Sequence, residues 1–478
     1  MIGAFRLNTL SAAMAVAGDP TITATGGTVT YSKTGSVITK IHNFNTSGSN
    51  SFIVSAVTGT PSLQAYLVAG GGAGGGSSGS NTAGGGGSGG WVLDQTVTGI
   101  TAQTYTISIG AGGTVSGFTT GGNGGDTTGF GYTSPGGKGG ATYATAGQAN
   151  TGAAGSGAGA GSSTGSNPAG GAGTYAGGNG FGAGGFTRAS GGGAGAGGAG
   201  GNAAASTAGT AGAAITSSRS GASEVYGRGG SGIIAAGGTG SAASGSEYGG
   251  GGGGGGNAAG GAGRQGKAIV TYTVPNKTYT FFSGTTSTTN GTWPSSLQAG
   301  DLAVFINCAT EASTTVPTTV VPTGFTSITN SSLSASGASM KTIASYKILT
   351  GSETGTITGM NSGGTRRCHL FIYRPSSAFE SVIVLTQFSE TATTVPTSQS
   401  ISLATKGGPY VAFGVYQATG AIGTRSSTVT ETRELSTGTT NYTKTFEATS
   451  SSVSFSNPSI SMTDGGTNCL MSFILQPV

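Results

Sequence analysis

The stretch between Gly70 and Gly266 limits what this chain can fold into, because it holds three quarters of the 100 glycines. Glycine loses more backbone entropy on folding than any other residue. Such a stretch, with few large apolar side chains, is typical of disordered low-complexity chain. Its other residues are mainly Ala, Ser, Thr and Asn, however, and single aromatic residues are spaced along it. Strand-like sequence precedes and follows it, so we expect this glycine-rich core to be ordered.

An ordered chain of this composition has few structural solutions. A collagen triple helix needs glycine at every third position, whereas the glycines here cluster irregularly, with only Pro135 and Pro168 among them. Polyproline-II-type helices have about three residues per turn and no internal hydrogen bonds. Where side chains are missing, such helices can lie side by side with their N–H and C=O groups paired between neighbours. We therefore expect a polyglycine-II-like helix bundle, with a mixture of irregular loops and short strands as the alternative.

Strand-like runs on both sides indicate a small β-domain into which the glycine-rich core (70–266) is inserted. These runs are rich in β-branched and aromatic residues and are separated by Gly, Asn and Ser. They lie at residues 28–31, 37–44, 51–54, 65–69, 103–110 and 267–274. We place this domain at residues 21–274. His42 lies alone in one of the runs, and we expect it to be a packed strand residue rather than a catalytic one.

The composition changes sharply after Pro275. Residues 275–478 have an ordinary glycine content and abundant Ser and Thr, and no window has a helical period. Turn-rich segments separate strong strand patterns at residues 302–306, 342–348, 370–374, 382–385, 410–416 and 471–475. This spacing predicts an antiparallel β-sandwich rather than alternating strands and helices. The whole chain is therefore expected to be all-β.

The charge content argues against nucleic acid as a partner. Charged residues make up 7% of the chain, against about 25% in an average globular protein. Arg366 and Arg367 form the only adjacent basic pair, which is too little for a phosphate-binding surface. No apolar run approaches the roughly 20 residues that a membrane-spanning helix needs. We expect no nucleic-acid partner and no membrane span.

Residues that carry chemistry are few. The three cysteines fit neither a disulfide framework nor a zinc site. Residues 261–268 are one residue short of a Walker A loop, but they lead into a strand rather than the helix that a P-loop needs. We expect Asp301 to act in a turn and Glu353 to pair with Lys347 on the sandwich surface. The sequence predicts a protein that is not an enzyme and has no metal or cofactor.

Residues 1–20 carry four larger apolar side chains on a segment of small residues: Ile2, Phe5, Leu7 and Leu10. The first residues of a domain are usually frayed, but exposed Phe and Leu rarely become ordered alone. We interpret the segment as an anchor peptide that docks on a partner or a neighbouring subunit, with an intrachain strand as the alternative. Its apolar stretch is interrupted by polar residues, so we expect no cleaved signal peptide.

Four stretches at the strand-to-glycine junctions carry a resemblance: KIHNF at 40–44, AYLVAGGG at 65–72, YTISIGAGG at 105–113 and GKAIVTY at 266–272. Together they resemble the glycine-rich domain that recurs in tail and fibre proteins of tailed bacteriophages. The resemblance covers about residues 32–272. Related phage adhesins bind receptors through the tip loops of glycine-helix bundles. No receptor-loop motif is identifiable here, so that specificity does not carry over.

The last part of the chain is also similar to a known module. LQAGDL at 297–302, PTGFT at 322–326, YKI at 346–348 with Glu353, and the pair Tyr373 and Arg374 resemble a β-sandwich module found in phage tail proteins. Phe325 stands where that module usually has Trp, and Pro375 where it usually has Gly. The module is a carrier or binding domain, so the resemblance implies no catalytic residues.

These resemblances imply a virion structural protein of a tailed bacteriophage, a tail fibre or tail-tip adhesin that binds the host surface. The N-terminal peptide would attach it to other virion proteins, and a glycan or outer-membrane protein of the host would be its receptor. Fibres are usually trimers, so a homo-oligomer is expected, with a trimer favoured, in a virion assembled in the host cytoplasm. The alternatives are a capsid decoration protein or head fibre docked through the same peptide, and a cell-encoded glycine-rich surface protein.

Aromatic residues of the glycine-rich core are candidate receptor contacts. Aromatic side chains are enriched at recognition surfaces, and sugar rings stack on them. Our candidates for exposed loops are Phe130, Tyr132, Tyr175, Phe181 and Phe186. The alternative is that they cap the ends of the bundle and hold its faces together.

Overall fold

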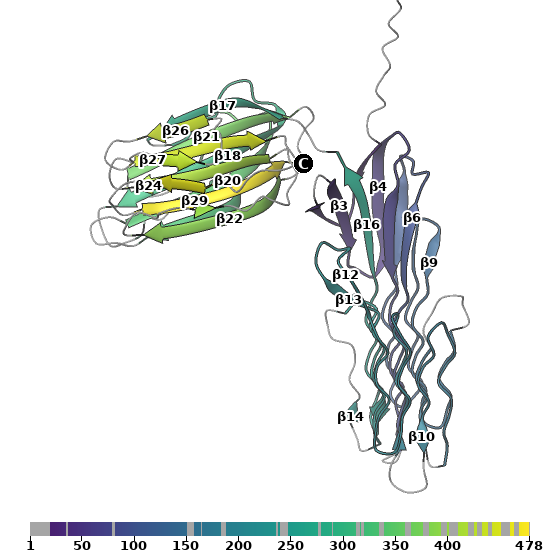
Figure 1. The fold of residues 1–478 in the computed structure, drawn as a ribbon. Helices are drawn as coiled ribbons and strands as arrows, with labels where there is room; N and C mark the ends of the chain where they lie inside the picture. Colours follow the sequence, from purple (N-terminus) through teal and green to yellow (C-terminus); the bar gives the residue numbers. More distant parts are fainter. Residues whose placement is uncertain are drawn as a thin grey trace, which may run out of the picture. The chain divides into compact units, whose positions relative to one another are not determined.

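The computed structural model describes residues 20–34, 37–78, 82–150, 157–163, 165–182, 188–235, 238–239, 247–275, 279–288, 290–311, 316, 320–333, 339–358, 365–375, 382–392, 399–400, 410–418, 425–427, 433–437, 442–450, 459–462 and 468–477. Every regular element among them is a β-strand (Figure 1). The chain divides into two compact units, one with the residues through Tyr31 and Thr39–Thr273, the other with Ser32–Ile38 and Val274–Val478. The predicted anchor residues Ile2, Phe5, Leu7 and Leu10 lie outside the described residues, and so does Phe186.

The first unit contains two five-stranded sheets. One has the strand order β1–β4–β7–β8–β9, with β1 (Thr21–Thr25), β4 (Gly48–Thr58), β7 (Thr104–Ile109), β8 (Thr127–Gly129) and β9 (Tyr132–Ser134). The other has the order β2–β3–β16–β5–β6, with β2 (Thr28–Thr34), β3 (Val37–Phe44), β16 (Lys267–Val274), β5 (Leu63–Val68) and β6 (Val92–Val97). Every strand predicted between residues 28 and 274 lies in or overlaps one of these elements.

Aromatic side chains fill the space between these two sheets. The Phe52 ring on β4 lies 5.0 Å from the His42 ring on β3 and 6.5 Å from the Tyr272 ring on β16, measured between ring centroids. His42 Nδ1 is 2.8 Å from the Gly26 carbonyl oxygen, and its Nε2 is 3.2 Å from the Tyr272 hydroxyl. Because a carbonyl oxygen only accepts, Nδ1 is the donor in the first of these bonds. The prediction that His42 is a packed strand residue is confirmed.

The sheet that contains β3, β5 and β16 is buried on both faces. Its outer face is covered by a hairpin of β12 (Ile215–Ser217) and β13 (Glu224–Tyr226). Ile41, Tyr66 and Ile269 of the sheet form one buried apolar cluster with Tyr226 of the hairpin. Burial on both faces explains why the sequences of β5 and β16 are apolar over consecutive residues rather than alternating.

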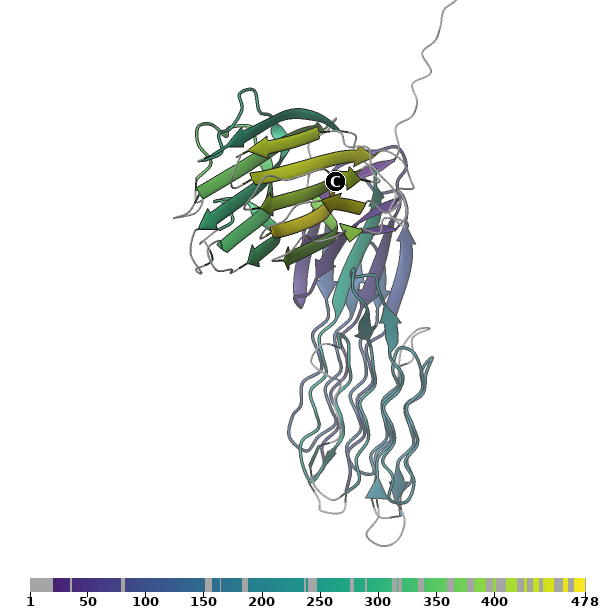
Figure 2. The same ribbon diagram turned by 60° about the vertical axis from the view of Figure 1, so that its left-hand side comes forward.

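The parts of the glycine-rich core that connect the strands in sequence are extended segments that run side by side (Figures 1 and 2). We call these segments the glycine bundle: residues 70–78, 82–90, 110–126, 136–150, 157–163, 165–180, 190–214, 227–235 and 249–266. Successive N–H groups from Gly71 to Gly76 donate, in order, to the carbonyl oxygens of Arg264, Ser88, Gly122, Gly261, Gly85 and Thr119, at 2.8–2.9 Å. Every third residue thus returns to the same neighbouring segment, so one segment is bonded to three others.

The close approach of these segments is the reason for the glycine content. A Cβ atom added at Gly74 would collide with the carbonyl oxygen of Gly253, and one at Gly230 would collide with that of Gly252. Methyl groups are accepted at some interior positions, where Ala73 and Ala158 are fully buried. Since buried N–H and C=O groups must be paired, hydrogen bonds between backbones replace an apolar core here.

The predicted bundle of polyglycine-II-like helices is not seen as a set of regular elements. Among the described residues of the glycine bundle no helix is assigned. The regular elements within the glycine-rich core that lie far from the two sheets are short antiparallel pairs, β10 (Phe181–Gly182) with β11 (Arg188–Ala189) and β14 (Gly238–Thr239) with β15 (Gly255–Gly256). The common helices are defined by hydrogen bonds between residues three to five apart in sequence, whereas the bonds of this bundle mainly join residues that lie much farther apart.

The second unit is an antiparallel β-sandwich, as predicted. One sheet has the order β17–β21–β18–β20–β19, with β17 (Tyr279–Ser287), β21 (Thr365–Pro375), β18 (Ala299–Glu311), β20 (Ser339–Thr350) and β19 (Thr326–Leu333). The other has the order β22–β29–β24–β27–β26, with β22 (Val382–Ala392), β29 (Asn468–Pro477), β24 (Tyr410–Ala418), β27 (Tyr442–Ser450) and β26 (Arg433–Thr437). A three-stranded sheet joins β23 (Gln399–Ser400), β28 (Ser459–Met462) and β25 (Arg425–Ser427).

The strand β18 is buried on both faces, and its sequence is accordingly apolar over consecutive positions. On one face, Leu302 and Val304 belong to the core between the two sheets, where the Phe413 and Phe473 rings stack with centroids 4.9 Å apart. On the other face, Ala303 and Phe305 belong to a second cluster, against which four partly buried side chains pack: Phe282, Trp293, Leu297 and Phe325.

An ion pair joins two of the stretches that carry the resemblance of this unit. Arg374, at the end of β21, places its Nε 3.1 Å from Asp301 Oδ1 and its Nη2 2.8 Å from Asp301 Oδ2. Asp301 is 1% exposed and also accepts the Gln298 N–H at 2.9 Å. The carboxylate thus closes the turn at the start of β18 and ties it to β21. The predicted turn role of Asp301 is confirmed.

Glu353 closes the turn that follows β20. Its Oε1 accepts the Thr350 N–H and its Oε2 the Gly351 N–H, both at 2.9 Å, and the Lys347 Nζ lies 3.0 Å from Oε1. Burial alone would raise the pKa of this carboxyl, but the hydrogen bonds from the backbone and from Lys347 favour its charged form and lower the pKa to about 2. The predicted pair of Glu353 with Lys347 is confirmed.

Adding one methyl group inside the glycine bundle should destabilise the first unit. We expect Gly74→Ala to lower its free energy of unfolding by about 3 kcal/mol, because the methyl group displaces the backbone of Gly253. The matched control is Gly129→Ala on β8, where a Cβ would make ordinary contacts of 3.5 Å or more. Scanning calorimetry of the two variants checks this. Equal transition temperatures for both would contradict the close approach of the segments.

The hydrogen bonds of Glu353 should make the second unit sensitive to acid. Its pKa lies below the ordinary value of 4.5 in the folded state, so its contribution is complete above pH 4.5 and is lost as pH falls towards 2. We expect Glu353→Gln to lower the free energy of unfolding by about 1–3 kcal/mol at pH 7, with the difference from wild type shrinking below pH 4.5. Denaturant unfolding measured across pH tests this.

The control for that experiment is Glu311→Gln, at the end of β18, since the Glu311 side chain makes no hydrogen bond or ion pair among the described residues. A difference between Glu353→Gln and wild type that stays constant from pH 7 to pH 2 would show that the carboxylate is not held in this way.

Candidate functional site

The glycine bundle ends, away from the two sheets, in a group of loops. The chain leaves β5 to enter the bundle and returns from residue 82 to reach β6, so residues 76–78 and 82–84 lie far from the sheets. The Gly76 N–H donates to the Thr119 carbonyl oxygen at 2.8 Å. The Thr142 hydroxyl donates to the carbonyl oxygens of Gly76 at 3.0 Å and Phe118 at 3.3 Å. These bonds bring residues 76–78, 116–120 and 142–145 together, and we call them the bundle end.

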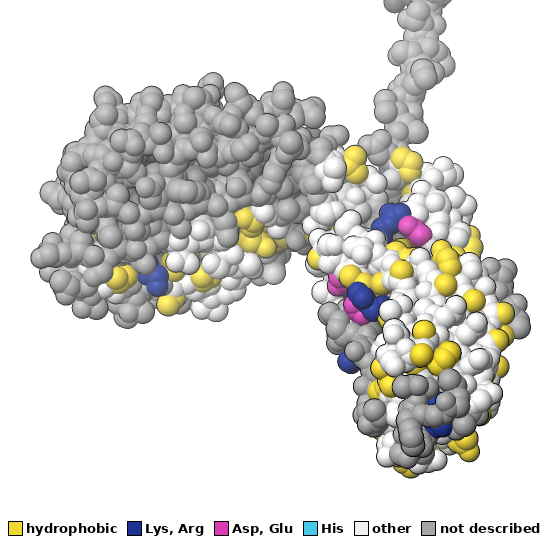
Figure 3. Space-filling view, turned by 60° about the horizontal axis from the view of Figure 1, so that its bottom comes forward, with side chains coloured by type: hydrophobic (Ala, Val, Ile, Leu, Met, Phe, Trp, Pro, Cys, Tyr) yellow, Lys and Arg dark blue, Asp and Glu magenta, His cyan; other side chains and the backbone are white. Residues whose placement is uncertain are grey.

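Two aromatic side chains of the bundle end are open to solvent. Phe118 is 52% exposed and Tyr143 45% exposed, and Val115 beside them is 40% exposed. Figure 3 is turned towards the lower end of the unit, where hydrophobic side chains, together with uncharged polar side chains and backbone, make up most of the described surface. The sequence marked Phe118 and Tyr143 only as members of a series of spaced aromatics. The Ser and Thr residues next to them in sequence were the available signal for an exposed loop. In the structure such residues form a turn, in which the Thr119 hydroxyl donates to the Ser116 carbonyl oxygen at 2.6 Å.

Two of the predicted contact residues lie in the β8–β9 hairpin rather than in a loop of the bundle. The Phe130 ring packs 5.8 Å from Phe52 and 5.1 Å from Tyr105, between centroids. It borders a shallow groove of about 410 Å³ next to the turn between β6 and β7. Tyr132 begins β9 and is half-buried.

The other two described candidates lie on separate parts of the glycine-rich core. Tyr175 is half-buried, with its ring 6.2 Å from that of Trp91, which precedes β6. Phe181 begins β10 and is half-buried. The structure therefore does not bring the four described candidates into one surface.

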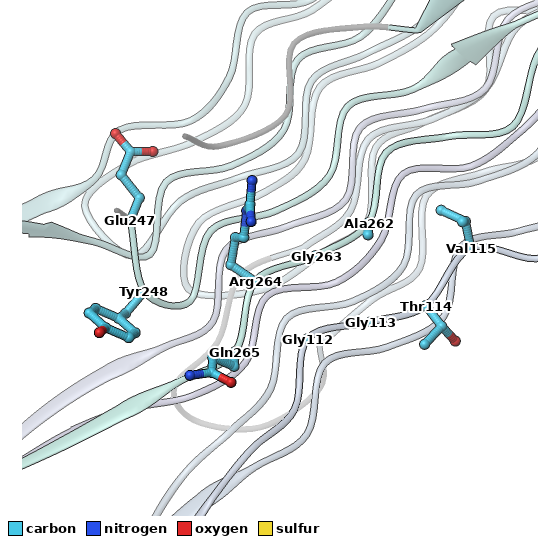
Figure 4. A pocket seen from close by; sticks show the side chains of 10 residues that line it. All are labelled: Gly112, Gly113, Thr114, Val115, Glu247, Tyr248, Ala262, Gly263, Arg264 and Gln265. Atoms are coloured by element: carbon cyan, nitrogen blue, oxygen red, sulfur yellow. The ribbon is translucent and has the colours of Figure 1, made fainter. Parts of the chain in front are cut away.

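A groove runs along the side of the glycine bundle (Figure 4). We call it the side groove, and its volume is about 710 Å³. Its lining comes from three separate segments: Gly112–Val115, Glu247–Tyr248 and Ala262–Gln265. Figure 4 shows Glu247, Tyr248 and Gln265 at one end, Thr114 and Val115 at the other, and glycines between them, with Arg264 near the polar end.

Two charged side chains line the polar end of the side groove, Glu247 and Arg264. Glu247 is 8% exposed, and Arg228 lies against it, with Nε 3.0 Å from Oε1 and 3.2 Å from Oε2. This pair cancels the charge of Glu247. Arg264 is exposed, and within the described part of the chain it has no acidic partner. The side groove is therefore left with one uncompensated positive charge.

A buried polar network lies behind this end of the side groove. Lys267 is 3% exposed, and its Nζ lies 2.7 Å from Glu224 Oε2 and 4.7 Å from the centroid of the Tyr248 ring. Burial would raise the pKa of Glu224, but hydrogen bonds from Lys267 and the Tyr226 hydroxyl lower it below the ordinary value. Burial and the nearby Glu224 raise the pKa of Tyr248. The network fixes the β12–β13 hairpin to the sheet and holds Tyr248 in place.

The same contacts explain the stretch that resembles a Walker A loop. Lys267 opens the strand β16 rather than a helix, and its ammonium group is paired with Glu224. Its side chain therefore cannot serve as a phosphate-binding lysine. Among the described residues, no group of three or more His, Cys, Asp or Glu side chains is placed to hold a metal ion, and no helix is long and apolar enough to cross a membrane.

A comparison with protein families matches residues 46–273 to a family described as a glycine-rich domain. The matched region begins before β4 and ends within β16, so it takes in the strands that bracket the glycine bundle as well as the bundle itself. A search of curated proteins finds no match for this chain. Over residues 46–273 the chain is therefore similar to glycine-rich domains of this family.

Proposed function

We propose that this protein is a structural protein of a tailed-bacteriophage virion, a tail fibre or tail-tip adhesin that binds the host surface. The observation that carries the proposal is the bundle end, where Phe118 and Tyr143 are exposed on a frame that is held by backbone hydrogen bonds. Exposed aromatic side chains on a rigid frame are what a recognition surface needs. The resemblance of both units to modules of phage tail proteins supports the same assignment.

We also propose that the glycine bundle is of the polyglycine-II type. Its hydrogen bonds support this, because N–H groups at positions 71 and 74 donate to one neighbour, those at 72 and 75 to a second, and those at 73 and 76 to a third. A return every three residues is the period of the polyproline-II helix. The stability of such a bundle depends little on salt concentration, because few of its contacts are between charged groups.

The remaining parts of the proposal concern assembly. The peptide of residues 1–20, with Ile2, Phe5, Leu7 and Leu10, attaches the protein to other virion proteins. A homotrimer is the favoured state, and a glycan or an outer-membrane protein of the host is the receptor. The protein assembles in the host cytoplasm and functions in the virion, without catalysis.

The purified protein should compete with phage for adsorption to susceptible host cells. We expect wild-type protein to block adsorption in a dose-dependent way, and the double variant Phe118→Ala, Tyr143→Ala to need at least about 10-fold more protein, because exposed aromatic anchors dominate binding at such surfaces. The control is Ile53→Ala, which removes an apolar side chain of similar exposure, 44%, from β4. No block by folded wild-type protein would overturn the adhesin assignment.

The number of copies per virion separates the proposal from its closest alternative. A tail fibre or tail-tip adhesin is present at tail stoichiometry, whereas a capsid decoration protein or head fibre is present in large excess over the tail proteins. Quantitative mass spectrometry of purified virions measures this ratio. A capsid-like copy number would move the assignment to the head.

A further inference from the structure

We propose that the side groove is a binding site for an acidic saccharide, with the carboxylate of the sugar paired to Arg264. This inference rests on the proposed function, since it names the chemistry of one receptor contact. It concerns a surface on the side of the glycine bundle whose lining includes neither Phe118 nor Tyr143, although Val115 at one end adjoins the bundle end.

The charge of the groove selects an acidic ligand. Arg228 and Glu247 cancel each other, which leaves Arg264 as the uncompensated charge among the described residues at the groove. The backbone of Arg264 is held in place, because its N–H donates to Gly250 O at 2.8 Å and its carbonyl oxygen accepts the Gly71 N–H at 2.8 Å. A fixed backbone with an exposed guanidinium group favours two-pronged pairing with a carboxylate.

The size and floor of the groove select a saccharide rather than a small anion. A volume of about 710 Å³ lies in the range of sites for organic ligands and exceeds what a single small anion fills. Its floor is formed mainly by glycine and alanine, and Ala262 is exposed while Gly112 is half-buried. The N–H groups of Gly113 and Gly263 donate within the bundle. Gly112 and Ala262 make no hydrogen bond among the described residues, so their amide and carbonyl groups are open to a ligand and match the hydroxyl groups of a sugar.

The two ends of the groove supply different contacts. Tyr248 is fixed by Lys267 beneath its ring, and its hydroxyl is a hydrogen-bond donor. The Gln265 amide is fixed by a hydrogen bond to the Asn45 carbonyl oxygen. At the opposite end, Val115 is 40% exposed and offers an apolar contact for a ring face or a methyl substituent. Polar groups at one end and an apolar surface at the other fit an amphipathic sugar chain.

The test uses the full-length protein on a glycan array that carries carboxylated glycans, with uronic or nonulosonic acids, and neutral glycans of matched length. We expect binding to be confined to the carboxylated glycans and to weaken as salt rises. We expect Arg264→Ala to bind about 10- to 100-fold more weakly, the loss expected when a charge-assisted hydrogen bond is removed. The control Arg366→Ala removes a half-buried positive charge from the second unit and should bind as wild type does.

Three results would overturn the inference: no binding to any array glycan, equal binding to neutral glycans, or binding by Arg264→Ala that equals wild type. Circular dichroism of Arg264→Ala shows whether it is folded, and Arg264→Lys, which keeps the charge but not the two-pronged geometry, should bind with intermediate affinity. The adsorption assay separates this inference from the proposed function. Block of adsorption by wild type and by Arg264→Ala at equal doses would keep the adhesin assignment and remove the side groove from it.

Discussion

Hydrogen bonds between backbones that lie in direct contact are the interaction on which the first unit depends. Each interior segment of the glycine bundle donates to several neighbours, and a side chain at Gly74 or Gly230 would occupy the place of a neighbouring carbonyl oxygen. Glycine pays for this arrangement with its large loss of backbone entropy. The unit therefore needs many such bonds at once, since a few of them would not offset the entropy lost by one isolated segment.

The two sheets of the first unit supply the side-chain packing that the glycine bundle lacks. Their apolar and aromatic side chains, such as Phe52 and Tyr272, pack between sheets and fix the positions at which the segments enter the bundle. The register of β5 with β16, in which Val68 faces Lys267, aligns the first segment of the bundle with its last. The pairing of strands in the sheets thus sets the register between neighbouring segments. The glycine bundle keeps this register, although its own residues carry no side chains that could specify it.

The strands with consecutive apolar residues were predictable from the sequence, whereas strands such as β6 and β27 and the surfaces were not. Runs such as 267–274 and 302–306 carry apolar residues that only a buried strand explains, so β16 and β18 could be located in advance. The turn role of Asp301 and the pair of Glu353 with Lys347 were predictable because both follow from local spacing. The path of the glycine segments was not, because glycine blocks contain no pattern that identifies a neighbour. For the same reason, Phe118 could not be distinguished from Phe130, which packs against Phe52, and the side groove joins three segments that nothing in their sequences relates.

The pairing of Gly71 with Arg264 has a consequence for how the first unit forms and how long it lasts. The segment after β5 gains one of its three neighbours only when the segment before β16 has been synthesised and returns to it. Contacts between residues so distant in sequence make folding slow. A pairing that forms late stabilises the native state but not the transition state, so it also slows unfolding. The lifetime of such a unit would then be set by an unfolding rate rather than by an equilibrium. The glycine bundle, which has almost no apolar core, can persist in this way for as long as its last segment stays in place.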